Sequence, residues 1–255
     1  MKVLRRTIPG LMLILAAAAH AEIPSGYVPP QRTDLPGIVG RDDRVPLDST
    51  AWPWQALGRI NQVGGYAHCT GTLVTPDTVL TAAHCVYSAQ AGRWLKPDEV
   101  IFAAGFRRDV WLDYAKGVSI RRSSDQPPSP AMSQIGHDWA MIRLEHRMAI
   151  RPVSIRSLVD GATGTSTATP HLLTAGYAMD RPYLLSMNDG CRIQGRTEEG
   201  RVLITNCDST KGDSGAPLLL REGNQYWVVG VFSAATAAHA RDAHSFAVDA
   251  SVFIK

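Results

Sequence analysis

The sequence has no excess of charge of one sign. Its 26 lysines and arginines nearly balance 23 aspartates and glutamates, and three of the positive charges, Lys2, Arg5 and Arg6, lie in a segment that we expect to be removed. This balance gives no support for nucleic-acid binding or for electrostatic attachment to a membrane. Charged residues make up only 19% of the chain and hydrophobic ones 45%, which excludes a largely disordered protein.

Long apolar runs are also scarce. The apolar stretch at residues 11–19 is shorter than the roughly 20 residues that a membrane-spanning helix needs. It follows basic residues and precedes a small-x-small sequence at residues 19–21, which is the pattern of a secretory signal peptide rather than of a membrane anchor. We therefore expect residues 1–21 to be a signal peptide. The mature chain would be exported, either secreted or periplasmic, with no membrane partner.

Helical periodicity of useful length is nearly absent, and short β-like runs separated by turn residues predominate. This pattern predicts an all-β barrel or sandwich. The runs include residues 70–74, 78–82, 100–104, 117–121, 139–144, 172–175, 201–205, 217–220 and 226–232. The proline-rich residues 22–37 lack the pattern and predict an extended leader, while the polar stretch 160–169 is the best linker candidate.

The four cysteines fall as two close pairs, Cys69 with Cys85 and Cys191 with Cys207. Export makes them candidates for disulfides, and pairing the neighbours is one of three possible connectivities. The alternative is a metal site built from Cys69, His84 and Cys85, which lacks the spacing usual for structural zinc. We expect no metal and no cofactor.

Three local sequences carry residues suited to nucleophilic catalysis. An apolar strand runs into His84, Asp138 stands at the start of another apolar strand, and Ser214 lies between Gly212 and Gly215 at a predicted tight turn. A histidine with a pKa of about 6.5 can accept the serine proton and return it to the leaving group, and an aspartate can orient that histidine. Backbone N–H groups around Gly212 and Ser214 are suited to binding the oxyanion that forms.

Each of these features is weak evidence alone, because a single histidine or aspartate is more often structural. Their occurrence together, in the order His, Asp, Ser in an exported chain, predicts a catalytic triad. The order also argues against an α/β-hydrolase, in which the serine comes first and the histidine last.

The same segments resemble the trypsin/chymotrypsin-type serine endopeptidases, and most nearly their bacterial V8-like (glutamyl endopeptidase) branch. Residues 81–85 and 212–217 match the most specific motifs of the family. Further similarities to the mature start of bacterial members, to the strand before the histidine and to the start of the second barrel lie at residues 38–44, 52–55, 69–74 and 175–177. The resemblance thus extends from about residue 38 to the C-terminus.

The resemblance implies an all-β fold of two antiparallel six-stranded β-barrels with the active site in the cleft between them. Residues 38–150 would form the first barrel and residues 151–255 the second. The Cys69–Cys85 pair corresponds to the family's disulfide that braces the histidine loop, and Cys191–Cys207 resembles a pair found in bacterial relatives.

The resemblance also assigns roles at the site. His84 would be the general base and acid, Asp138 would orient it, and Ser214 would be the nucleophile that forms an acyl-enzyme with a polypeptide substrate. Gly212 and Ser214 would supply the amides of the oxyanion hole.

Activation by proteolysis is a further expectation. Residues 38–40 resemble a trypsin-type mature N-terminus, so an activating protease would cut before Ile38 and the new α-ammonium would pair with Asp213. Residues 22–37 would then be a propeptide and the uncut chain a zymogen. The alternative is that Asp213 only accepts hydrogen bonds from nearby loop amides and that no processing occurs.

Asp208 and Ser209 resemble the segment at the base of the trypsin specificity pocket, which predicts a preference for Arg or Lys at P1. The Cys207–Asp208 sequence also resembles bacterial relatives without that specificity, in which the acid is structural. Glutamyl-specific members place a histidine where this chain has Phe232, so glutamate specificity is not expected. Backbone groups from Ser233 to Ala235 would pair with an extended substrate.

The sequence therefore predicts an exported serine endopeptidase. Two alternatives remain open at this point. One is a catalytically inactive, protease-like binding protein, because folds are often reused without their chemistry. The other is an exported esterase that uses the same triad.

Overall fold

The structure is a computed structural model that describes residues 35–48, 50–65, 67–158, 171–197, 199–237 and 242–254. The expected signal peptide, nearly all of the expected propeptide and the expected linker lie outside these residues. Strands dominate the described part of the chain, in which the only α-helix is α1 (Met132–Ile135). No helix among the described residues is long and apolar enough to span a membrane.

Six strands of the first half form a closed antiparallel barrel. In order around the barrel these are β2 (Leu57–Gln62), β3 (His68–Thr75), β4 (Thr78–Thr81), β9 (Ala140–Leu144), β8 (Asp113–Arg122) and β7 (Val100–Ala104). In β9 the buried residues Ala140, Ile142 and Leu144 alternate with the more exposed Met141 and Arg143. This alternation turns every second side chain into the barrel, as the sequence pattern requires.

The second unit is an eight-stranded antiparallel sheet. Its order is β1 (Val45–Leu47), β11 (Leu185–Cys191), β10 (His171–Gly176), β14 (Pro217–Glu222), β15 (Gln225–Ala235), β16 (Ser245–Asp249), β13 (Val202–Thr205) and β12 (Ile193–Thr197). The all-β, chymotrypsin-like expectation is confirmed, although this unit has eight strands where six were expected. One addition is β1, which precedes the first barrel in sequence and crosses over to pair Val45 with Met187 and Leu47 with Leu185.

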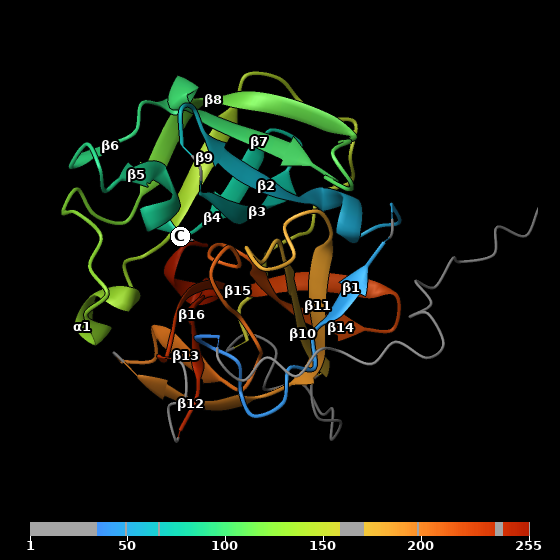
Figure 1. The fold of residues 1–255 in the computed structure, drawn as a ribbon, viewed down its shortest axis with the longest axis vertical. Helices are drawn as coiled ribbons and strands as arrows, with labels where there is room; N and C mark the ends of the chain where they lie inside the picture. The colour runs from blue at the N-terminus through green and yellow to red at the C-terminus, as the bar shows by residue number, and fades with distance from the viewer. Residues whose placement is uncertain are drawn as a thin grey trace, which may run out of the picture.

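Figure 1 shows the barrel, in teal and green, above the second sheet, in orange and red, with β1 in blue alongside β11. Minor elements are the hairpin β5 (Tyr87–Ser88) with β6 (Arg93–Trp94) and the 3₁₀ turns Trp54–Ala56, Ala83–Val86, Pro97–Glu99 and Ala250–Val252.

One of the hydrophobic clusters among the described residues extends across both units. It includes Leu80 and Ile142 from the barrel together with Leu173 and Val231 from the second sheet. The hydroxyl of the buried Tyr177 also donates to the backbone oxygen of Phe106 across the junction, at 2.8 Å. Because shared packing fixes the two units against each other, side chains from both can be held in one site.

Candidate active site

His84 and Asp138 lie together at the edge of the first barrel. His84 stands in the 3₁₀ turn Ala83–Val86 that follows β4, and Asp138 stands just before β9. The backbone N–H of His84 donates to Asp138 Oδ1 at 2.8 Å, and the ring Nδ1 lies 2.7 Å from Asp138 Oδ2. Both carboxylate oxygens therefore bind the same residue, which fixes the tautomer and the orientation of the ring.

The two partners adjust each other's proton affinity. Partial burial opposes charge on the ring, but the Asp138 carboxylate outweighs this effect and raises the pKa of His84 above its usual value. Burial likewise opposes charge on Asp138, but the contacts with His84 and a hydrogen bond from the Ser233 hydroxyl hold the pKa of Asp138 below its usual value. The Ser233 Oγ to Asp138 Oδ2 distance is 2.5 Å. The site therefore stabilises an imidazolium beside a carboxylate.

The histidine turn is braced by a disulfide between Cys85 and Cys69 of β3. A second disulfide joins Cys191 to Cys207, so the structure has the neighbour connectivity that was one of the three possibilities. His84 and both sulfurs of the first pair lie within 4.8 Å of one another. Those sulfurs are bonded to each other, however, and are not available as thiolate ligands for a metal.

Ser214 lies on the turn that enters β14, and glycines make this turn possible. Gly212 has a φ of +94° and Gly215 a φ of +81°, a region that other residues rarely adopt. A Cβ atom on Gly215 would stand 2.2 Å from both the Thr70 carbonyl oxygen and Thr81 Oγ1. The turn is thus pressed directly against the first barrel.

Hydrogen bonds to β3 fix the serine turn beside the histidine turn. The Thr70 N–H donates to the Ser214 carbonyl at 2.9 Å, and the Thr70 hydroxyl donates to the Gly212 carbonyl at 2.9 Å. The Ser214 carbonyl oxygen also lies 3.7 Å from the sulfur of Cys85, the residue after His84. The structure therefore brings His84, Asp138 and Ser214, which are far apart in the sequence, to one place.

The proposed oxyanion-hole amides are free of protein acceptors within the described part of the chain. Neither the Gly212 N–H nor the Ser214 N–H donates to a described residue. The backbone of Gly212 rests closely on the segment after β10, because a Cβ there would lie 2.4 Å from the Tyr177 carbonyl oxygen. Two unoccupied donors beside the candidate nucleophile Ser214 are what an oxyanion hole requires.

Asp213 points away from the substrate side into the protein. It is 4% exposed, and Oδ2 accepts the Thr210 N–H at 2.9 Å, while Oδ1 has no partner among the described residues. Burial raises the pKa of Asp213 to about 7. The structure does not join Ile38 to this carboxylate. In the continuous chain the Ile38 N–H instead faces the Leu35 carbonyl, at 3.5 Å.

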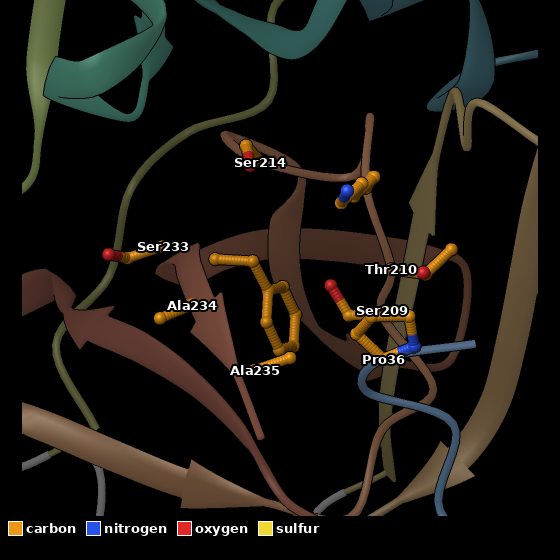
Figure 2. Close-up of a pocket in the computed structure, with 9 residues that line it drawn as sticks. Pro36, Ser209, Thr210, Ser214, Ser233, Ala234 and Ala235 are labelled. Atoms are coloured by element: carbon orange, nitrogen blue, oxygen red, sulfur yellow. The ribbon is translucent and has the colours of Figure 1, made fainter. Parts of the chain in front are cut away.

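A pocket of about 240 Å³ lies beside Ser214. In Figure 2 Ser214 stands at its top, with Ser233 and Ala234 on one side and Pro36, Ser209 and Thr210 on the other. Four of the five expected pocket residues line it, namely Ser209, Phe232, Ser233 and Ala235.

Asp208 does not line this pocket. Its side chain is 4% exposed, and its two oxygens accept the N–H groups of Val39, at 2.8 Å, and Asp43, at 2.9 Å. Burial raises the pKa of Asp208 to about 6. The expected carboxylate at the pocket floor is therefore engaged by the segment that leads to β1, because that segment passes directly behind residue 208.

Sequence reasoning missed three lining residues, Pro36, Thr210 and Lys211. Pro36 lines the pocket because the next residue, Gly37, is fixed by two backbone hydrogen bonds. The Gly37 N–H donates to the Thr236 carbonyl and the Gly37 carbonyl accepts the Ser209 N–H, each at 3.1 Å. No local signal identifies Pro36, since its place depends on pairing with distant segments.

A second hollow, of about 270 Å³, continues past the histidine. His84, Asp138, Ile135 and the prolines at 128 and 130 line it. Ser233 and Ala234 line both hollows, so a groove runs from the pocket beside Ser214 to the imidazole. A groove of this length is suited to an extended chain.

The fold and this arrangement define the class of chymotrypsin-like serine endopeptidases. The sequence pattern of the family described as Trypsin matches residues 42–255, and the chain belongs to the trypsin family. The chain is also similar to a solved structure of a Glu endopeptidase in complex with MPD. The TM-score is 0.65 at 21% identity, covering 84% of this chain and 93% of that one, which bears on the fold alone.

Curated relatives are similar over shorter stretches. Human chymotrypsin-like elastase family member 3B is 33% identical over 81 residues, which are 31% of this chain and 29% of that protein. Melanization protease 1 of Drosophila melanogaster is 29% identical over 241 residues, covering 77% of this chain and 58% of that protein. The trypsin/chymotrypsin-type expectation is thereby confirmed, and membership of the bacterial V8-like branch stays a prediction.

Proposed function

We propose that the mature chain is an exported serine endopeptidase that acts through Ser214, His84 and Asp138. The observation that carries the proposal is the double contact of Asp138 with the N–H and the ring Nδ1 of His84. Since Nδ1 is committed to the carboxylate, Nε2 is the ring nitrogen left to exchange a proton with the serine.

The proposed reaction has two halves. His84 Nε2 takes the Ser214 proton as Oγ attacks the peptide carbonyl, and the Gly212 and Ser214 N–H groups bind the oxyanion. Asp138 stabilises the imidazolium, which then protonates the leaving amine. A water molecule, deprotonated in turn by His84, hydrolyses the acyl-enzyme and restores the serine.

For substrate choice we propose an uncharged P1 side chain in place of the basic one that the sequence predicts. The walls of the pocket that remain after cleavage before Ile38 include Phe232 and Ala235, and Lys211 is the one charged residue among those that line it. The Asp208 carboxylate is buried and bonded to two amides, so an Arg or Lys side chain would have to displace those bonds.

Export and processing complete the proposal. The two disulfides suit an oxidising compartment, in agreement with a signal peptide at residues 1–21. Cleavage before Ile38 by an activating protease would free an α-ammonium, for which the unpaired Asp213 Oδ1 is a suitable acceptor. It would also free Pro36 to leave the pocket. N-terminal sequencing of the active secreted form should begin at Ile38, and a start at Glu22 would overturn this step.

The function is tested by hydrolysis of a peptide library with varied P1 residues and of simple ester substrates, with Ser214→Ala as the matched control. We expect cleavage of peptides at uncharged P1 residues, lost in the control. Hydrolysis of esters alone would identify an esterase, and hydrolysis of neither would identify a binding protein. Strong cleavage after Arg or Lys would show that Asp208 contacts the P1 side chain from the pocket floor, as the sequence predicts.

A further inference from the structure

Arg44 is an arginine buried near the active site that the triad chemistry does not use. Its side chain is 1% exposed and lies between two aspartates. Nε and Nη2 donate to the two oxygens of Asp42, each at 3.0 Å, and Nη1 and Nη2 donate to the two oxygens of Asp180, at 3.1 and 3.0 Å. Each of these contacts is a fork, in which two N–H groups of the guanidinium donate to the two oxygens of one carboxylate. The two forks fix the geometry of both carboxylates.

Arg181 completes the cluster. It donates to Asp42 Oδ2 at 2.7 Å and to the backbone oxygen of Arg44 at 2.8 Å. The cluster thus joins the segment before β1 to a turn 136 residues further on, at residues 178–181. That turn is closed by the Arg181 N–H, which donates to the Ala178 carbonyl at 2.9 Å.

The same turn supports the oxyanion hole. The Met179 N–H donates to the Lys211 carbonyl at 2.7 Å, directly before Gly212. A Cβ on Gly212 would lie 2.7 Å from that nitrogen and 2.4 Å from the Tyr177 oxygen, so the glycine has no room to shift toward the turn. Asp213 packs equally closely on Gly176, at the end of β10, because a Cβ on that glycine would lie 2.4 Å from Asp213 Oδ1.

We propose that Arg44 is a positioning residue for the oxyanion hole: it fixes the turn at residues 178–181, on which Gly212 rests, and so sets the direction of the Gly212 N–H. The inference rests on the proposed function. Removing Arg44 would take two hydrogen bonds from the buried carboxylate of Asp180 and leave it with Arg181, whose Nε lies 3.6 Å from Oδ2, so the turn would rearrange around the weaker pair. Removing Arg44 would then weaken the stabilisation of the transition state, which lowers kcat, and would leave substrate binding, and therefore KM, unchanged.

The test compares Arg44→Lys with Arg41→Lys in the purified mature protein. Lysine keeps the charge but cannot form two forks, and Arg41 is an exposed arginine of the same segment, 3.9 Å from Asp43. We expect kcat of Arg44→Lys to fall about 10- to 100-fold, as for a misplaced oxyanion donor, with KM within about twofold of the unsubstituted protein. Arg41→Lys should match the unsubstituted protein in both.

Asp180→Asn provides a second route should Arg44→Lys fail to fold, because it removes one fork at the turn and leaves Arg44 in place. It should also lower kcat at constant KM and weaken the binding of a peptide boronate by a similar factor. A folded Asp180→Asn protein with unchanged kcat, or with a change in KM alone, would overturn the inference. An unsubstituted protein that cleaves no peptide would instead overturn the proposed function.

Discussion

On the first-barrel side of the site, both oxygens of the buried Asp138 accept hydrogen bonds, whereas on the second-sheet side one oxygen of the buried Asp213 has no partner among the described residues. The pKa of Asp138 is held below its usual value, while burial raises the pKa of Asp213 to about 7. In the continuous chain both oxygens of the acid that contacts His84 are therefore bonded. The acid beside the proposed nucleophile has one oxygen that could still accept a hydrogen bond from a cation.

Asp208 extends the comparison. It is also on the second-sheet side, and each of its oxygens accepts a hydrogen bond, but from a backbone amide rather than from a side chain such as His84. Burial alone therefore does not distinguish a catalytic carboxylate from a structural one. The identity of the donors does, because only Asp138 binds a side chain that would change its charge during the proposed reaction.

The largest effect on kcat is expected from Asp138→Asn, which tests the contrast between Asp138 and Asp208. An amide cannot hold the ring in the required tautomer or stabilise the imidazolium, so kcat should fall about 10⁴-fold. The measurement is steady-state peptide hydrolysis, with Asp208→Asn as the matched buried control. Similar losses in both variants would show that the two carboxylates have the same role.

A smaller effect is expected from Ser233→Ala, which removes one hydrogen bond from Asp138 but leaves both bonds to His84. A charge-assisted hydrogen bond contributes about 1.5 to 3 kcal/mol, and only part of this should reach the transition state, so kcat should fall about tenfold or less. If kcat fell as far as in Asp138→Asn, the serine rather than the histidine contacts would be fixing the carboxylate.

The raised pKa of Asp213 predicts a pH dependence of stability for the uncut chain. Between its usual value of 3.8 and about 7, the folded state keeps a proton that the unfolded state has released. Stability from this group is therefore present below about pH 4 and is lost as the pH rises to 7. The free energy of unfolding in urea should fall less steeply across this window in Asp213→Asn than in the unsubstituted chain. Parallel curves would contradict the assignment.

The smallest effect is expected at the pocket. Asp208→Asn keeps the residue's size and should leave the ratio of kcat/KM for Arg and Ala P1 substrates nearly unchanged, because Asp208 does not line the cavity. Because the Val39 and Asp43 N–H groups bind different oxygens of Asp208, the asparagine keeps one of these hydrogen bonds and loses the other. A large and selective loss of cleavage after Arg would show that the carboxylate contacts substrate.

Local sequence predicted the strands, which follow from short apolar runs separated by turn residues. The disulfide pairing and the approach of His84 to Asp138 were implied by the resemblance to the trypsin family, since the residues alone left three disulfide connectivities open. The turn at Ser214 was equally predictable, because Gly212 and Gly215 permit a backbone that other residues resist.

Features that depend on long-range packing were not predictable. The Arg44–Asp180 contact joins residues 136 apart, and neither lies in a recognisable motif. The engagement of Asp208 and the entry of Pro36 into the pocket both depend on the path of the segment before β1. A local pattern carries no information about which distant segment covers a side chain.

The most direct test of the central claim is mass spectrometry of the mature protein after reaction with a small organophosphonate, carried out in parallel on His84→Ala. The account predicts one phosphonyl group per chain, located on Ser214, and a reaction that is largely abolished when His84 is replaced. A folded protein that remains unlabelled, or labelling of Ser214 at the same rate without His84, would contradict it.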